Sequence, residues 1–347
     1  MTLTFEPLSN APKPVRLTHF SKASGCGCKI APAVLHEITK GLSAEGERLL
    51  VGFSTGDDAA AFDLGNGRAL LQTVDFFSPV VDDAFTFGKI AAANSISDIY
   101  AMGGRPFGAL AVLGWPSEKI PASLAREVMQ GALSICKEAG VILAGGHTID
   151  SAEPFFGLSV SGEIASAHIK RNSTAKDGDL IFLTKPVGTG MLAAACKRDV
   201  ITASEIEDAI KSMCTLNVAG MRLAEWEQVH AVTDVTGFGL LGHLLEMCDG
   251  AGLKAVVHYD RIPVFNKVKE LCAAFVYADN TMRNWKAYGE KTLGVDGEKL
   301  LVLCDPQTNG GLLIAVDPDC EKIFLNAFPE AVNIGRFVAG NGVEMMS

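Results

Sequence analysis

Strand-like and helix-like segments alternate along this chain, but several strand-like segments follow one another with no helix between them. In the first half the patterns predict two helices, 85–102 and 123–139, and five strands, 50–53, 68–74, 107–113, 141–144 and 155–164. Neighbouring parallel strands need a long crossover, usually a helix, whereas antiparallel strands are joined by short turns. The chain therefore favours an α+β fold with mixed or antiparallel sheets over a doubly wound parallel sheet.

A second α+β unit is predicted after the polar connection 165–178. Its patterns predict a long helix over 205–226, helices after Gly190 and over 239–251, and strands over 179–184, 230–232, 254–258, 300–304, 312–316 and 332–338. A length of 347 residues allows two domains, each with a core of its own. We expect an N-terminal arm over 1–48, a first domain over 49–165 and a second over 166–347.

The arm carries Gly25-Cys26-Gly27-Cys28-Lys29, a segment with reactive groups and little sign of regular structure. A thiol is nucleophilic only as thiolate, and a cation such as Lys29 lowers its pKa. The residues before it, 10–24, have no sustained hydrophobic period, which indicates a mobile arm. A reactive thiol on such an arm suggests delivery of a group to a site elsewhere.

Three plainer interpretations of Cys26 and Cys28 stay open: a metal site, a disulfide and ordinary loop cysteines. A structural zinc site needs four ligands, and no second closely spaced Cys or His pair follows. A disulfide spanning one residue would be strained.

Charge and cysteine usage narrow the class of protein. The net charge is −10 with no basic patch, which argues against a nucleic-acid binder, although carboxylates can hold polyphosphate through a cation. Nine scattered cysteines fit a reducing compartment. No run of 18 or more apolar residues occurs, so we expect no membrane span and a cytoplasmic protein.

Aspartates recur at the ends of predicted elements, the pattern that a magnesium site for a phosphorylated substrate needs. Asp58 follows a strand, Asn94 and Asp98 share one helix face, Asp75 ends a strand and Asp234 precedes a helix. Taken singly, each could instead be a helix cap or a solvated turn. We also predict a flexible loop at 145–148 and a turn-rich loop at 304–311, and find no Walker A motif.

Together these motifs resemble the selenophosphate synthetases (selenide, water dikinases) from about residue 16 onward. The segments that carry the resemblance are 26–29, 57–59, 73–77, 94–104, 145–150, 233–242 and 305–311. The resemblance implies synthesis of selenophosphate, orthophosphate and AMP from ATP, selenide and water. It also implies magnesium and a homodimer whose first domains pair into a barrel-like sheet.

The resemblance also implies roles for individual residues. Cys26 and Lys29 match catalytic residues, and the family's magnesium ligands match Asp58, Asp98 and Asp234. Its ATP contacts match Lys29, Thr55, Gly56, Asp57, Asp75 and Asp98, with Gly146, His147 and Thr148 reaching ATP from the neighbouring subunit. Gly56 and Asn309 depart from the family pattern, where a larger, often basic residue and a serine are common.

Two rivals remain. One is another ATP-using enzyme of the same superfamily, which would lack the cysteine-bearing arm and would not depend on selenide. The other is a non-catalytic selenium or metal carrier, which would form no AMP.

Overall fold

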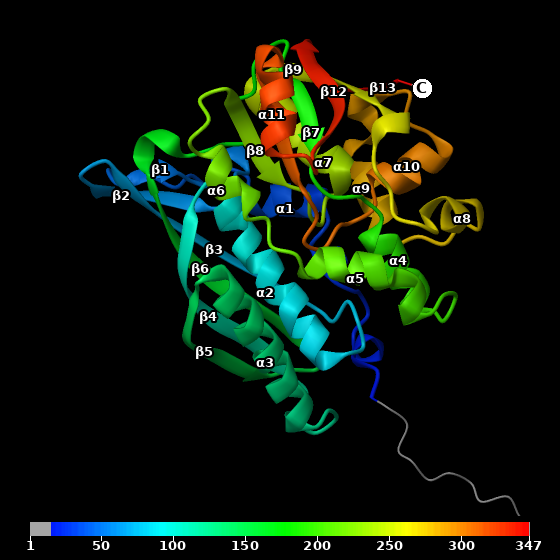
Figure 1. The fold of residues 1–347 in the computed structure, drawn as a ribbon. Helices are drawn as coiled ribbons and strands as arrows, with labels where there is room; N and C mark the ends of the chain where they lie inside the picture. Colours follow the sequence, from blue (N-terminus) through cyan, green and yellow to red (C-terminus); the bar gives the residue numbers. More distant parts are fainter. Residues whose placement is uncertain (1–14, 347) are drawn as a thin grey trace, which may run out of the picture.

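Two β-sheets, each packed against helices, make up the computed structural model, which describes residues 15–346 (Figure 1). The first sheet has strand order β1-β2-β3-β6-β4-β5 and is antiparallel except between β4 and β5. Its strands are β1 (Leu49–Val51), β2 (Ala60–Gly65), β3 (Arg68–Phe77), β4 (Arg105–Trp115), β5 (Ile142–Asp150) and β6 (Phe155–Ala165).

The second sheet has strand order β10-β13-β9-β12-β7-β11-β8, and β13 runs parallel to both of its neighbours. Both sheets are thus mixed, as the sequence predicts. The strands are β7 (Leu180–Leu183), β8 (Val229–Asp234), β9 (Leu253–His258), β10 (Thr292–Leu293), β11 (Leu312–Val316), β12 (Val332–Ala339) and β13 (Gly342–Met346).

Helices cover one face of the first sheet and both faces of the second. The first sheet is covered by α2 (Ala84–Ala101) and α3 (Ala122–Ala139). On the second, one core contains α7 (Gly239–Ala251) and residues of four smaller helices, and the other contains α11 (Glu321–Ala327). The remaining helices are α1 (Pro32–Thr39), α4 (Thr189–Lys197), α5 (Glu207–Cys214), α6 (Ala219–Leu223), α8 (Val268–Ala273), α9 (Thr281–Tyr288) and α10 (Gly297–Leu303). Short 3₁₀ turns join several of these elements, and two of them, η1 (Leu17–Phe20) and η2 (Cys26–Cys28), lie in the arm.

Helices α2 and α3 touch through their backbones. A Cβ atom at Gly88 would collide with the carbonyl oxygen of Val128, and one at Gly131 with that of Phe85. Fifteen of the 18 residues of α2 are buried, because the sheet, α3 and the second half of the chain all pack against it. Its polar residues Asn94 and Asp98 are therefore held at fixed positions inside the molecule.

The opposite face of the first sheet is apolar and has no helix over it. Val74, Phe76, Leu110 and Ile149 all point outward there with between 46% and 56% of their surface exposed. The register places Phe76, Gly157, Val112 and His147 in one row across the four strands β3, β6, β4 and β5. His147 therefore lies on this exposed face.

Three predicted elements were wrong. The predicted helix 205–226 is split into η5 (Ala203–Ile206), α5 and α6, with extended backbone at Thr215. Where the helix is interrupted, the backbone carbonyl groups of Met213 and Thr215 accept hydrogen bonds from the side chains of Asn309 and Lys185. The predicted strand 300–304 lies in α10, since a short buried apolar run does not distinguish a helix from a strand.

The third error is the loop predicted at 145–148, which lies inside edge strand β5. Gly146 has φ 159° and a Cβ there would collide with the carbonyl oxygen of Ala111 in β4. The glycine allows the two backbones to approach closely at an irregularity of the β4–β5 register. Two other strands end later than predicted: β3 continues past Asp75 to Phe77, and β5 continues past Ala144 to Asp150.

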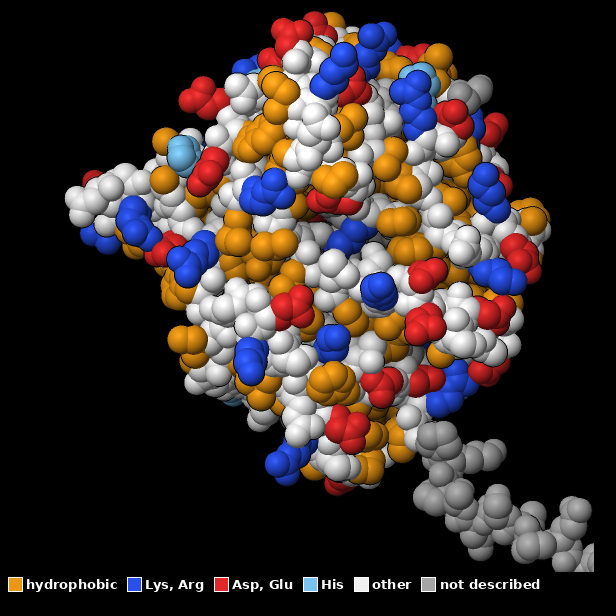
Figure 2. Space-filling view, in the orientation of Figure 1, with side chains coloured by type: hydrophobic (Ala, Val, Ile, Leu, Met, Phe, Trp, Pro, Cys, Tyr) orange, Lys and Arg blue, Asp and Glu red, His pale blue; other side chains and the backbone are white. Residues whose placement is uncertain are grey.

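Among the described residues, none of the helices is long and apolar enough to cross a membrane. On the face shown in Figure 2, Lys and Arg side chains are scattered among acidic ones and form no continuous basic area.

Candidate functional site

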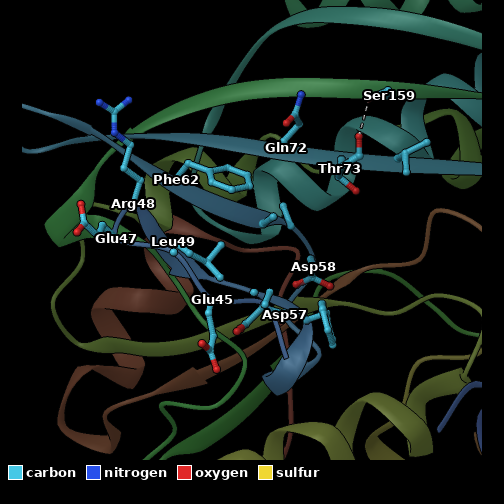
Figure 3. A pocket seen from close by; sticks show the side chains of 17 residues that line it. Glu45, Glu47, Arg48, Leu49, Asp57, Asp58, Phe62, Gln72, Thr73 and Ser159 are labelled. Atoms are coloured by element: carbon cyan, nitrogen blue, oxygen red, sulfur yellow. Dashed lines mark hydrogen bonds between the residues drawn. The ribbon is translucent and has the colours of Figure 1, made fainter. Parts of the chain in front are cut away.

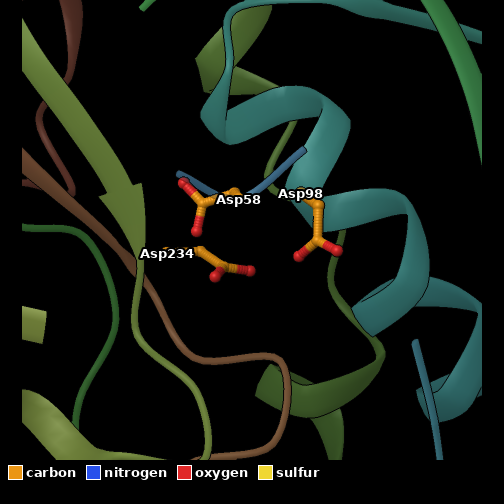
Figure 4. A group of neighbouring side chains, drawn as sticks. All are labelled: Asp58, Asp98 and Asp234. Carbon is orange, nitrogen blue, oxygen red and sulfur yellow. The ribbon is translucent and has the colours of Figure 1, made fainter. Parts of the chain in front are cut away.

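Three aspartates from three separate elements meet between the two halves of the molecule (Figure 4). Asp58 precedes β2, Asp98 lies in α2, and Asp234 ends β8. One carboxylate oxygen from each lies within 4.8 Å of the others. The structure thus brings together the three residues for which we expect magnesium binding.

Neighbouring hydroxyl groups orient these three carboxylates. Thr73 donates to Asp98 at 2.5 Å, and Thr233 donates to Asp58 at 2.9 Å. Ser97, also on α2, donates to Asp234 at 2.5 Å. The other oxygen of Asp58, Oδ2, is buried without a hydrogen-bond partner among the described residues.

The electrostatics of the cluster fit a bound cation. Burial, and then the charges of neighbouring aspartates, raise the pKa of Asp58 and Asp98 well above the ordinary value. Burial also raises the pKa of Asp234. Mg²⁺ prefers oxygen ligands such as carboxylates. Its positive charge would also offset the repulsion among the three neighbouring aspartates. The residues present therefore fit the metal.

A cleft of about 970 Å³ opens beside the cluster (Figure 3). Asp57 and Asp58 lie at one end, and Phe62, Gln72, Thr73 and Ser159 lie along the sheet. The remaining wall, residues 44–49, carries Glu45, Glu47 and Arg48. The cleft has the volume of a nucleotide-sized ligand site.

Asp57 lines one end of this cleft, but its carboxylate binds protein groups. Asp57 Oδ1 accepts the backbone N–H of Asn172 at 2.8 Å, and Thr55 donates to Asp57 Oδ2 at 2.5 Å. The Asn172 side chain also donates to the carbonyl of Gly56. Gly56 itself has φ 67°, a left-handed conformation that suits glycine.

Residues 25–29 of the arm are docked beside the cluster, whereas Arg16 and Thr18 bind Asp82 farther along the chain. Gly237, three residues after Asp234, has no side chain where the Cys26 carbonyl and the Lys29 side chain pass. Lys29 Nζ lies 3.5 Å from Asp75 Oδ1. The Cys26 thiol donates to Asn94 Oδ1 at 3.3 Å, and the Asn94 amide donates to Asp75 at 2.5 Å. The arm thus reaches the face of α2 that carries Asp98.

Cys26 and Cys28 differ in exposure. Cys26 is fully buried, whereas Cys28 is exposed, and neither forms a disulfide. Burial, and then the charge of Asp75, raise the pKa of Cys26 well above its ordinary value, although Lys29 acts in the opposite direction. In the docked arm, burial therefore opposes the activation of this thiol that we expect from Lys29. Burial favours the neutral thiol more than Lys29 favours its anion.

The Lys29 ammonium stays charged. Burial would lower its pKa, but the negative charge of Asp75, followed by those of Asp98 and Asp234, raises it above the ordinary value. A fixed positive charge thus lies beside the aspartates.

Gly146, His147 and Thr148 are not part of this site within one chain. They line a separate cavity of about 350 Å³ at β5, together with apolar residues of β4 and α3.

Sequence reasoning missed several residues that hold the site together. Asn217 donates to Ser97 and to the carbonyl of Gly310, and Asn172 fixes Asp57. Neither asparagine lies in a motif, so no sequence signal marks it. Thr73 lies two residues before Asp75, and Thr233 directly precedes Asp234. Both could therefore have been predicted as site residues.

Comparison with known proteins identifies the family. Residues 56–164 match the N-terminal domain of AIR synthase related proteins, and residues 176–346 match the C-terminal domain. Selenide, water dikinase from Colwellia psychrerythraea is 50% identical over 312 residues, 89% of this chain and 91% of the relative. The chain belongs to the selenide, water dikinase family.

Members of this family are enzymes, and other relatives are equally similar. Selenide, water dikinase from Aeromonas hydrophila is 48% identical over 313 residues, 90% of this chain and 91% of the relative. The structure of AaThiL complexed with AMPPCP and TMP has a TM-score of 0.67 at 20% identity and covers 90% of this chain and 92% of that one. That likeness shows a shared two-domain α+β fold.

Proposed function

We propose that this enzyme makes selenophosphate from ATP, selenide and water, releasing AMP and orthophosphate. The observation that carries the proposal is the docking of Cys26 and Lys29 onto the aspartate cluster. About 50% identity to selenide, water dikinases over most of the chain supports the same activity.

In this proposal Asp58, Asp98 and Asp234 hold Mg²⁺, which neutralises phosphate charge when bound. Phosphoryl transfer depends mainly on positioning and on such neutralisation. ATP lies in the cleft beside the cluster, with Asp57 at one end of the cleft and Thr55 and Gly56 directly before it in the sequence. Asp98 belongs to the cluster, and Asp75 lies beside it. The Lys29 ammonium stabilises charge that develops on the transferred phosphate.

We assign Cys26 to handling of selenium. Its thiol is neutral while the arm is docked, so it donates a hydrogen bond to Asn94 rather than acting as an anion. Release of the arm exposes the thiol to water and removes the burial that raises its pKa. We therefore propose that residues 1–48 form a mobile arm whose docked position excludes water from the phosphates. Its first 14 residues lie outside the described residues.

We further propose a homodimer formed through the exposed face of the first sheet. Contiguous exposed apolar patches mark interaction sites, and this one continues to the unpaired edge strand β5. A second copy would cover the face and bring its Gly146, His147 and Thr148 toward the cleft. We also propose the domain boundaries 49–165 and 166–347, which the division of the strands between the two sheets supports. The cytoplasmic location stays a prediction.

The experiment is to incubate the purified protein with ATP, Mg²⁺ and selenide under anaerobic conditions and to record phosphorus NMR spectra. We expect AMP, orthophosphate and a species with a phosphorus–selenium bond in equal amounts. ADP formed without selenide would instead indicate another ATP-using enzyme of the superfamily. Bound selenium with no AMP would indicate a carrier.

A further inference from the structure

A small cavity lies behind the cysteine turn, apart from the ATP cleft and the aspartate cluster. Its volume is about 80 Å³, enough for a few atoms and too small for a nucleotide. The arm forms one wall with Ser24 and Gly27, α4 forms a second with Lys197 and Arg198, and Asp279 and Asn280 form the third. The cavity is complete only while the arm is docked.

Asn280 marks this cavity as more than a packing defect. Only 1% of its surface is exposed, and neither its amide nitrogen nor its amide oxygen has a hydrogen-bond partner among the described residues. The Ser24 hydroxyl on the opposite wall is also buried without a partner. Buried polar groups left unpaired destabilise a fold, so a hydrogen-bonding occupant is expected.

The charges around the cavity restrict what that occupant can be. Lys197 donates to three carbonyl groups of the arm, those of Ser21, Lys22 and Ala23, so its ammonium is fixed at the wall. Arg198 is paired with Asp279 at 2.6 Å. Three cations, Lys22, Lys197 and Arg198, against the one carboxylate of Asp279 leave a net positive wall. Asp279 repels a doubly charged phosphate more strongly than a singly charged anion.

We propose that this cavity binds the small chalcogenide substrate, hydrogen selenide, next to the turn that carries Cys26 and Cys28. The Asn280 amide and the Ser24 hydroxyl donate to the anion, and Lys197 supplies the positive field. The inference rests on the proposed function. It adds a binding site for selenium that is separate from the phosphate-binding groups.

Steady-state kinetics test the site in two directions. Asn280→Asp places a second carboxylate in the wall and should raise the KM for selenide at least about tenfold with the KM for ATP unchanged, as expected for loss of a hydrogen bond to an anion. Asp279→Asn removes the repelling charge and frees Arg198, so it should lower the KM for selenide. Ser24→Ala should raise it more mildly. The exposed loop substitution Asn341→Asp is the matched control.

A purely structural role for Asn280 would not move the selenide KM in opposite directions in the two variants. If both leave it unchanged while the wild type makes selenophosphate, the cavity is not the selenide site. Thermal unfolding of each variant shows whether it folds.

A second measurement does not depend on turnover. Hydrogen exchange over residues 17–30 should slow when anaerobic selenide is added without nucleotide, because the occupant binds only the docked arm. Inorganic phosphate should give no such protection, and Asn280→Asp should abolish the effect of selenide. Protection by phosphate and not by selenide would assign the cavity to the product and overturn the proposal. This readout still applies if the enzyme proves to make no selenophosphate.

Discussion

The hydroxyl oxygen of Thr308 accepts the backbone hydrogen of Cys26 at 3.1 Å, across 282 positions of sequence. The same hydroxyl lies where a side chain on Gly25 would have to be. Gly25 also has φ 54° and donates its N–H to Ser78. The cysteine turn is therefore held by one residue from each half of the chain.

Gly25→Ala should release the arm. A left-handed conformation costs a non-glycine residue roughly 1–2 kcal/mol, and the collision with Thr308 adds to it. A penalty of this size lowers the docked population about 5- to 30-fold. Selenophosphate formation should fall accordingly, while hydrogen exchange over 17–30 rises. Gly41→Ala, also at positive φ but with open space around it, is the control for backbone strain alone. Wild-type exchange in Gly25→Ala would contradict the docking role.

Cys26→Ser should abolish selenophosphate formation and leave nucleotide binding intact. The serine hydroxyl can still donate to Asn94, so the docked arm keeps its geometry and only the thiol is lost. Cys28→Ser should be milder, because Cys28 is exposed on the other side of the turn. Product formation followed by phosphorus NMR compares the two variants. Equal loss in both would mean that the thiols act as a pair.

Magnesium should stabilise the protein through the three aspartates. At about 100 times its Kd, a ligand that binds only the folded state adds about 2.7 kcal/mol to the free energy of unfolding. The rise in Tm should be reduced or lost in Asp58→Asn, Asp98→Asn and Asp234→Asn. Asp177→Asn, at an exposed position of the connection, should keep it. A full magnesium response in all three cluster variants would show that the ion binds elsewhere.

Asp305 should make stability depend on pH. Burial raises its pKa to about 7, although Met191, Gln307 and Gly190 donate hydrogen bonds that act against the shift. The folded state then binds more protons than the unfolded state between about pH 4 and 7. The free energy of unfolding falls as pH rises through this window, by up to roughly 1.4 kcal/mol per pKa unit.

Chemical denaturation of wild type and Asp305→Asn at pH 5 and pH 8 measures this contribution. The variant cannot titrate, so its loss of stability between the two pH values should be smaller than that of the wild type. The same loss in both proteins would mean that other groups are responsible.

The exposed face of the first sheet should control the oligomeric state. Leu110→Arg places a charge in the centre of this face and should convert a dimer into a monomer in sedimentation velocity. Leu64→Arg, at the end of β2, changes a leucine of similar exposure, 55% against 51%, and should leave the dimer intact. A dimeric Leu110→Arg variant would place the interface elsewhere.

The elements predicted best were those with a clear period or a clear end. The helix predicted over 85–102 and that over 123–139 agree with α2 and α3 to within one residue, since glycines follow both. The resemblance to the family anticipated the cluster of Asp58, Asp98 and Asp234. The positions of these acids in the sequence indicated only a site shared among several aspartates.

What the sequence could not supply were features set by contacts between distant segments. The break at Thr215 depends on Lys185 and Asn309, and the buried state of Cys26 depends on Thr308 and Asn94. Local sequence patterns do not indicate which distant segments will be in contact. The sequence indicates that Lys29 can lower the pKa of Cys26. It does not indicate the larger effect of burial, which raises that pKa.

The contact between α2 and α3 has a consequence for how this chain can vary. Gly88 and Gly131 lie far from the chemistry, on the side of α2 away from the cleft, yet neither has room for a methyl group. Any larger residue at either position would push α2 along or away from the sheet and carry Asn94 and Asp98 with it. A deep mutational scan should thus show that even alanine is not tolerated at Gly88 or Gly131, and distance from the substrate would be a poor guide to which residues can be exchanged.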